Sequence, residues 1–201
     1  MDTISAITQR RSVKKYDTSA TMPEEDVQHL LDLALLSPTS FNIQNWRFVV
    51  VRDPELRKQL RTAAWNQAQV EEAHMVIVIC GDIRAWAKSP ERYWRNVPEE
   101  TRNVLVPMIG NYYENAGPQV QRDEVMRSGA IAAQTLMLAA KAMGYDSNPM
   151  IGFDPQQVAD LIKLPEDHEI VMMVVIGKAA EKARPRGGQL DKCEVVFNDT
   201  F

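Results

Sequence analysis

The sequence has little cysteine and histidine, and this scarcity excludes several classes of site. Of its 201 residues, only two are cysteine and three are histidine. Cys80 and Cys193 are too far apart to suggest a disulfide framework or a zinc knuckle, and they fit a reducing cytoplasm. No second histidine or cysteine lies three or four positions from His29, His74 or His168, so no zinc site is expected.

Other familiar signals are also missing. The nine glycines never form GxGxxG, and neither a phosphate-binding GxxxxGK[ST] loop nor a G-x-S-x-G nucleophile motif occurs. The longest uncharged apolar-rich run, residues 128–140, is too short to span a bilayer, and the N-terminus does not resemble a signal peptide. A net charge of −4 argues against a protein devoted to nucleic acid. We therefore expect neither a membrane nor a nucleic acid as a partner.

What the sequence does contain is a regular succession of amphipathic and apolar segments. Helices are predicted where apolar residues recur at helical spacing between capping residues and breakers. Thr21 is expected to cap the second helix with Glu24 in a capping box, and Val27, Leu30 and Leu35 belong to its apolar stripe. The predicted helices cover residues 2–9, 21–36, 53–73 (one or two helices), 121–144 and 154–164.

The apolar runs predict strands, and the segments between and after them are expected to lie on the surface. Strands are expected at residues 46–53, 74–82 and 169–179, with a further strand-like stretch at 193–197 in a loop-like tail. Residues 84–118, rich in aromatics and broken by prolines, are interpreted as a surface insertion of short helices. Residues 1–201 are expected to form one α/β or α+β domain, and a regular doubly wound sheet is not favoured because the strands do not alternate with single helices.

A basic cluster stands out against the overall acidity. The stretch "RRSVKKYD", residues 10–17, places four cations within six residues. In an extended chain Arg10, Ser12 and Lys14 share one face, and Arg11 points to the other. Donors of this kind suit an oxyanion such as a phosphate. A solvated basic strand without any ligand is the alternative.

A polar loop follows the second predicted helix. The stretch "SPTSFNIQNWRF", residues 37–48, surrounds two aromatic residues with hydroxyl and amide side chains. Such a loop can hydrogen-bond a flat heterocycle with polar edges. It can equally be a helix-stop loop held together by its own bonds from side chain to backbone.

Together these stretches resemble the nitroreductase family of FMN-dependent oxidoreductases. The family begins with R-x-S-x-R/K, and its later loop follows S-P-S/T-x-x-N-x-Q-x-W. The segment "GYDSNPMIGFD", residues 144–154, resembles the family segment after the long central helix, and "ARPRGG" resembles the basic pair near the C-terminus. The four pieces occur in the family's order and spread over most of the chain.

The resemblance implies an α+β fold with a mixed central sheet flanked by helices, in an intertwined homodimer with non-covalent FMN at the subunit interface. It implies contacts from the basic cluster and C-terminal pair to the phosphate, ribityl chain and pyrimidine edge, and contacts from the polar loop of the other subunit. Polar side chains at 67 or 69 and backbone groups at 150–152 would approach the ring. The implied FMN-binding residues are Arg10, Arg11, Ser12, Lys14, Ser37, Pro38, Thr39, Ser40, Asn42, Gln67, Gln69, Met150, Ile151, Gly152, Arg184 and Arg186.

The family chemistry is a ping-pong hydride transfer. NADH or NADPH reduces the flavin, and a nitroaromatic, quinone or similar acceptor then reoxidises it, so no protein side chain need be catalytic. A cation at the pyrimidine edge, assigned to Lys14, would favour the reduced flavin. Residues 84–118 would shape the acceptor pocket, although these aromatics can instead anchor the segment to the domain. The candidates for stacking are Phe41, Trp94, Tyr112 and Tyr113.

Two rival functions stay open from the sequence. Relatives of this family dehalogenate or dehydrogenate on the same fold, and nothing in residues 84–118 selects the acceptor. The other rival is a non-catalytic binding module, whose basic strand would contact RNA or a protein. The acidic overall charge weighs against the second rival.

Overall fold

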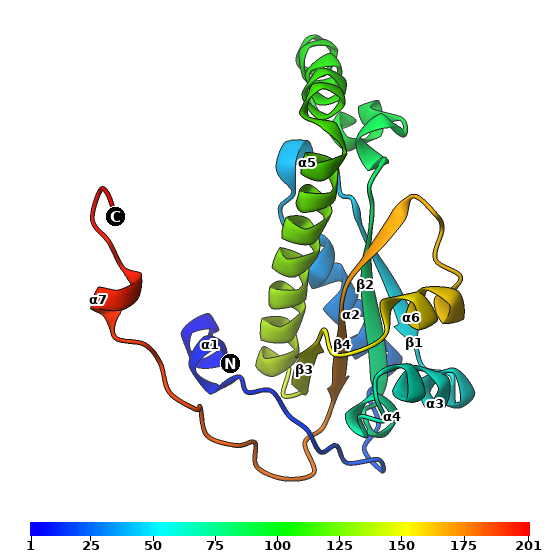
Figure 1. Ribbon diagram of the computed structural model, residues 1–201, viewed down its shortest axis with the longest axis vertical. Helices are drawn as coiled ribbons and strands as arrows, with labels where there is room; N and C mark the ends of the chain where they lie inside the picture. The colour runs from blue at the N-terminus through cyan, green and yellow to red at the C-terminus, as the bar shows by residue number, and fades with distance from the viewer.

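A four-stranded antiparallel sheet forms the centre of the molecule, and the computed structural model describes residues 1–201 (Figure 1). The strands are β1 (Trp46–Val51), β2 (Met75–Asp82), β3 (Asp146–Met150) and β4 (His168–Gly177), in the order β1-β2-β4-β3. All strand pairs are antiparallel, and the only parallel pairing is an isolated bridge between Ser12 and Ser147. The expected α+β fold is therefore confirmed, and its mixed character is limited to that bridge.

Helices cover both faces of the sheet. The helices are α1 (Thr3–Gln9), α2 (Glu24–Leu35), α3 (Pro54–Ala63), α4 (Gln69–Glu72), α5 (Glu99–Ala142), α6 (Pro155–Ile162) and α7 (Lys192–Val195), with 3-10 turns η1 (Ser40–Asn42), η2 (Ala85–Ala87) and η3 (Pro90–Trp94). In Figure 1, α5 runs beside the sheet, with α3, α4 and α6 grouped at the lower right. No helix has the length and apolarity needed to cross a bilayer.

Strict alternation along the strands builds two cores. In β2, Val76 and Val78 pack with α3, α4 and α6, whereas Ile77 and Ile79 pack with α2 and α5. Successive strand residues face opposite sides, so a strand covered on both faces reads as a continuous apolar run. This is why the segments at 46–53, 74–82 and 169–179 were predictable as strands, and those predictions are confirmed.

Close approach of α5 to the sheet depends on two glycines. A Cβ on Gly81 would lie 2.4 Å from a methyl group of Val125, and one on Gly129 would lie 2.5 Å from a methyl group of Val171. Both distances are far below van der Waals contact. The absence of side chains at these two positions therefore allows α5 to lie directly on β2 and β4.

Several sequence expectations are wrong in detail. Thr21 does not cap α2, because Pro23 keeps an extended backbone (ψ 147°) and the helix begins at Glu24, beyond the reach of Thr21. Leu35 is 47% exposed rather than part of the stripe. The expected strand at 193–197 is instead α7, because Asp191 and Glu194 form a capping box and no strand lies beside it.

The segment expected as an insertion is continuous with the main helix. Residues 84–118 form η2, η3 and the first part of α5, which is interrupted by Gly117 (φ 80°, ψ 176°) rather than beginning at residue 121. Strand β3 was not predicted, because Asp-Ser-Asn-Pro is a poor strand sequence. Pro149 is tolerated there since β3 is an edge strand of the four-stranded sheet.

Candidate active site

Two arginines from opposite ends of the chain meet beside α1. The tail crosses the N-terminal segment so that Nη2 of Arg186 lies 3.3 Å from the carbonyl oxygens of Ile7 and Arg10. Burial, followed by the charges of Arg186 and Arg11, lowers the pKa of Arg10 below its usual value. Nη1 of Arg10 is buried without a hydrogen-bond partner. Arg10 and Arg186 therefore concentrate positive charge at this position, and one N–H donor of Arg10 has no partner.

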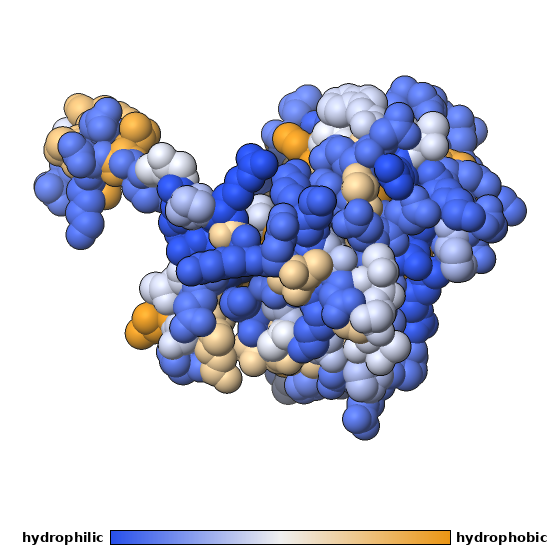
Figure 2. All heavy atoms as spheres, turned by 90° about the horizontal axis from the view of Figure 1, so that it is seen from below, coloured by the Kyte–Doolittle hydropathy of each residue, from blue (hydrophilic) through white to orange (hydrophobic).

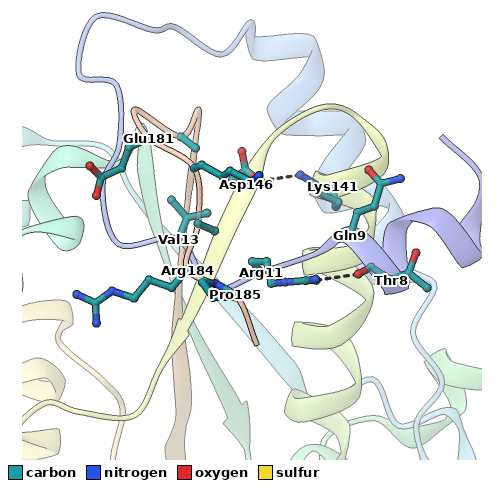
Figure 3. Close-up of a pocket in the computed structure, with 12 residues that line it drawn as sticks. Thr8, Gln9, Arg11, Val13, Lys141, Asp146, Glu181, Arg184 and Pro185 are labelled. Carbon is teal, nitrogen blue, oxygen red and sulfur yellow. Dashed lines mark hydrogen bonds and ion pairs between the residues drawn. The ribbon is translucent and has the colours of Figure 1, made fainter. Parts of the chain in front are cut away.

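The other predicted phosphate ligands differ in where their side chains point. Arg11 turns back and donates to the carbonyl oxygens of Thr8 (2.7 Å) and Arg10 (2.9 Å). Arg11 and Arg184 line a pocket of about 930 Å³, and their side chains extend in opposite directions in Figure 3. Lys14 is exposed and makes no ion pair. Arg11 and Arg186 both donate to the carbonyl of Arg10, so the structure groups these three arginines, whereas the side chain of Arg184 extends away from Arg11.

Strand β3 continues the site from Ser12 towards the sheet. Ser12 pairs with Ser147, and the amide of Val13 donates to the Ser147 carbonyl at 3.1 Å. Ser147 Oγ and Asn148 Nδ2 are both buried without partners. Our sequence reasoning missed these two residues. They lie within the stretch 144–154 that carries part of the family resemblance, but the burial of their side chains without partners becomes visible only in the structure.

A cluster of amide side chains gathers at the far end of β3. Gln67 Nε2 donates to the carbonyl of Gly152 at 2.8 Å, and Gln69 Nε2 donates to Gln67 Oε1 at 2.9 Å. Gln69 Nε2 also lies 3.8 Å from Met150 Sδ. The structure thus brings together the predicted ring-edge residues from 67–69 and 150–152, even though these segments are about 80 positions apart in sequence.

Gly152 sits beneath an exposed tryptophan. A Cβ at this position would lie 3.2 Å from the ring of Trp65 and 3.3 Å from Gln67 Nε2, so a larger residue would have to shift these side chains by a few tenths of an ångström. Trp65 is 68% exposed and adopts a left-handed backbone (φ 54°). The neighbouring Ile151 is 79% exposed. Trp65 was also missed from the sequence, where it lay within a predicted helix.

The polar loop 37–44 is held in an unusual backbone shape. Phe41, Asn42 and Gln44 all have positive φ, a conformation that non-glycine residues rarely adopt. The amide of Gln44 donates to Thr39 Oγ1 at 3.0 Å, and the Ser40 amide donates to a Glu124 carboxylate at 3.3 Å. Repeated left-handed residues indicate strain that the surroundings must stabilise, as is common at functional sites.

Some side chains of the loop 37–44 are buried, and others are exposed to solvent. Ser37 is 6% exposed and its Oγ has no partner, whereas Pro38 and Asn42 are exposed to solvent. Asn42 Nδ2 donates to the carbonyl of Tyr93 at 2.7 Å, and Trp94 Nε1 donates to the carbonyl of Phe41 at 3.1 Å. The loop and η3 therefore form one unit.

This loop lies far from the arginine pair of the same chain. The loop contacts α5 at Glu124, whereas the pocket beside the arginine pair is lined by Lys141 at the other end of that helix. Seventeen residues of helix separate these positions, which is roughly 25 Å at 1.5 Å per residue. One protomer alone does not bring the loop and the arginine pair onto the same small ligand.

The four aromatic candidates have different environments. Tyr113 is 1% exposed, and burial raises its pKa to about 12, so it belongs to the core that anchors residues 84–118. Trp94 and Phe41 are partly buried against that same core. Tyr112 is 48% exposed, with its ring 5.5 Å from that of Phe41. Tyr112 and Phe41 thus remain the candidates that a ligand can reach.

His168 is isolated in the sequence but not in the structure. Potential ligand atoms of Asp82, Asp167 and His168 all lie within 4.8 Å of one another. Lys88 already bonds Asp82 (2.8 Å) and Asp167 (2.6 Å), and His168 Nδ1 lies 2.7 Å from Asp167. These ion pairs fix the start of the segment 84–96 to the end of the sheet, which is a sufficient role for the cluster.

Comparison with known proteins agrees with this architecture. The Nitroreductase family model matches residues 7–178. Protein DrgA of a Synechocystis species is 54% identical over 91% of this chain and 87% of its own, and the NADH dehydrogenase of Thermus thermophilus is 34% identical over 92% and 90%. A nitroreductase-type protein of Exiguobacterium sibiricum, solved in complex with FMN, superposes with a TM-score of 0.93 at 31% identity, covering 99% of this chain and 98% of that one.

The fold matches that of an FMN-bound nitroreductase-type protein, and the candidate site residues come from a basic N-terminal segment, the edge strand β3 and an amide cluster. The chain belongs to the nitroreductase family, because the family model matches most of its length and a relative of more than half identity covers nearly all of it. The expectation drawn from its motifs is confirmed.

Proposed function

We propose that the protein is an FMN-dependent oxidoreductase that uses NADH or NADPH to reduce nitroaromatic, quinone or similar acceptors. The observation that carries this proposal is the convergence of Arg10 and Arg186, two residues 176 positions apart, beside a strand with unsatisfied buried donors. When bound, FMN supplies the hydride chemistry, taking a hydride from the nicotinamide and giving it to the acceptor in ping-pong order. The protein residues bind and orient the reactants.

The arginine pair fits the phosphate of FMN. A phosphomonoester carries about −1.5 to −2 charge near neutral pH, and two adjacent guanidinium groups match that charge. Nη1 of Arg10 is a donor without a partner, so an added oxyanion would satisfy it instead of competing with an existing bond. Without such an anion, the positive charges of Arg186 and Arg11 act unfavourably on Arg10. Arg11 adds a further positive charge beside the pair, and Arg184 contributes at longer range or holds the tail in place.

The remainder of the site fits a flat ring with polar edges. Ser12 and Asn148 offer donors along the ribityl and pyrimidine side, and Gln67 with Gln69 offers amides near the backbone of residues 150–152. These groups are neutral, so they orient a ring without adding a competing base. Lys14 is free of ion pairs and can swing to the pyrimidine edge, where a cation stabilises negative charge. In this proposal, the basic segment holds the phosphate, and the neutral donors hold the ribityl chain and the ring.

The site is completed, in this proposal, by a second copy of the chain. The loop at Ser37, Pro38, Thr39, Ser40 and Asn42 lies roughly 25 Å along α5 from the arginine pair, so it serves the flavin of the partner rather than its own. Phe41 and Tyr112 would then cover the acceptor position of the partner. This makes an intertwined homodimer the functional unit.

The C-terminal tail supports the same assembly. It leaves the body of the molecule after β4 and ends far from the sheet (Figures 1 and 2). Its apolar residues are largely exposed, with Phe197 at 50% and Phe201 at 105%, and their rings contact each other at 4.6 Å. An apolar arm that packs on nothing in its own chain fits a surface of a second protomer. Cys80 and Cys193 are both free, which fits the cytoplasm as location.

One anaerobic experiment tests the proposed activity. The purified protein should be yellow, and stoichiometric NADH or NADPH should bleach its flavin absorbance in the absence of oxygen. Adding a nitroaromatic or quinone should then restore the colour. A colourless protein that gains no flavin on incubation with FMN would contradict the proposal, as would a bound flavin that neither nicotinamide reduces.

A further inference from the structure

A second cationic pocket lies outside the proposed flavin site, between the polar loop and η3. Its volume is about 520 Å³, and no acidic residue lines it. The lining residues are Asn42, Gln44, Trp46, Arg47, Arg92, Tyr93, Arg95 and Asn96. Three arginines around one cavity are unexpected in a chain of net charge −4 and are unexplained by the flavin chemistry.

Two of these arginines carry uncompensated charge. Arg47 is held by Asp82 (3.2 Å) and by the carbonyls of Gln44 and Trp46. Neither Arg92 nor Arg95 lies within ion-pair distance of a carboxylate. Arg92 is instead placed by its own neighbour, with its guanidinium 4.8 Å from the ring centroid of Tyr93.

The pocket also offers neutral donors. Trp46 is 6% exposed, and its Nε1 is buried without a hydrogen-bond partner. Gln44 and Asn96 add amide groups from two sides. A cavity with unpaired cations, neutral amide donors and no carboxylate on its walls is suited to an oxyanion.

The pocket is rigidly connected to the loop that is proposed to reach the partner's flavin. Asn42 contributes to both, and its Nδ2 donates to the carbonyl of Tyr93 at 2.7 Å. The left-handed residues Asn42 and Gln44 turn the chain so that one side of the loop faces the pocket. In the proposed dimer, the loop would carry this pocket towards the flavin of the partner.

We propose that this pocket is an oxyanion subsite, supplied in trans by Arg92 and Arg95, for the charged end of a substrate whose other end reacts at the flavin. The shared chemistry is a phosphate or carboxylate. The phosphates of a nicotinamide dinucleotide are one source, because they lie away from the reacting ring. A carboxylate on an aromatic acceptor is the other source. The inference rests on the proposed function, since it assigns a specificity determinant to that reaction.

The test compares Arg92→Gln/Arg95→Gln with a matched control, Arg52→Gln. Arg52 lies just beyond the other end of β1 and pairs with Glu24 on the surface, so its loss removes a charge without touching the pocket. Flavin content and dimer state are measured first, because both should equal those of the unmodified protein. Nicotinamide reduction is then followed with NADPH, NADH and reduced nicotinamide riboside, which has no phosphate.

If the anion is a coenzyme phosphate, the KM of the double variant for NADPH or NADH should be about tenfold higher or more, and its KM for the riboside should be unchanged. If the anion belongs to the acceptor, the loss should instead appear for 4-nitrobenzoate and be absent for 4-nitrobenzamide. Either pattern supports the subsite and identifies its source. Unchanged kinetics with all five substrates, in a variant that retains flavin, would overturn it.

A binding measurement separates this inference from the proposed function. Inorganic pyrophosphate, titrated calorimetrically into the protein loaded with FMN, should bind the unmodified chain and Arg52→Gln, and binding to the double variant should be lost. If the protein binds no flavin at all, the proposed function fails. Pyrophosphate binding that is lost in Arg92→Gln/Arg95→Gln would still show the anion subsite, and equal binding by all three proteins would exclude it.

Discussion

Arg186 donates to the backbone carbonyl of Arg10 at 3.3 Å, so the two ends of the chain close on each other beside α1. This contact brings the guanidinium group of Arg186 to the backbone of Arg10 without an acidic partner, and burial with neighbouring positive charge lowers the pKa of Arg10. Like charges at close range are unfavourable, and an anion bound between them would offset this cost. The proposed position of the FMN phosphate follows from this relationship.

The packing of α5 on the sheet gives a first prediction, for stability. Gly129→Ala gains helix propensity of about 1 kcal/mol, but its methyl group meets Val171 at 2.5 Å, and overpacking costs about 1–3 kcal/mol. The net expectation is a loss of up to about 2 kcal/mol in the free energy of unfolding, measured by denaturant titration. Val171→Ala in the same chain should recover much of it. Simple additivity of the two substitutions would show that the contact is not the cause.

The tail gives a prediction for assembly. A chain that ends after Gly188 keeps Arg184 and Arg186 but loses the apolar residues from Leu190 onward. If those residues pack on a partner, the shortened protein should dissociate to monomers at a concentration at least tenfold higher, as measured by analytical ultracentrifugation. It should also release FMN on dilution at that same concentration, because the partner's loop completes the site. A shortened chain with unchanged dissociation would contradict this role of the tail.

His74 gives a prediction for pH dependence. Burial, and then the charges of Arg57 and Arg52, lower its pKa below the usual value of 6.5. The unfolded chain therefore binds a proton more readily than the folded one, so stability falls as pH drops through the unfolded pKa near 6.5. The decrease in Tm between pH 7.5 and pH 5.5 should be smaller in His74→Gln than in the unmodified protein. Equal decreases in Tm in both proteins would show that His74 does not cause the loss of stability at low pH.

Much of the fold was predictable because its signals are local. The apolar runs at β1, β2 and β4 indicate strands that are covered on both faces. Asp53 and Asp154 are the N-caps of α3 and α6, and each accepts a hydrogen bond from the backbone amide three residues later in the sequence. Strand β3 escaped prediction because its residues are poor strand formers. These residues form a strand only because β4 lies beside them and pairs with them, and this pairing is a property of the tertiary structure.

The site was predictable to a similar degree, and for a similar reason. Motif order pointed to the basic cluster, the polar loop, the amides and the C-terminal pair, but side-chain direction decides which members meet. Arg186 and Arg11 both contact the carbonyl of Arg10, whereas the side chain of Arg184 extends away from Arg11. Ser147, Asn148 and Trp65 were missed, because unsatisfied donors and exposed aromatics become visible only once the backbone is placed.

The most direct test of the central claim is the flavin content of Arg10→Gln/Arg186→Gln, measured by absorbance after purification beside the unmodified chain and Arg52→Gln. The account predicts about one FMN per protomer in the last two proteins and less than a tenth of that in the double variant, with its dimer and its Tm without flavin unchanged. Full flavin retention by the double variant would show that the phosphate is held elsewhere, and the assignment of the site would be wrong.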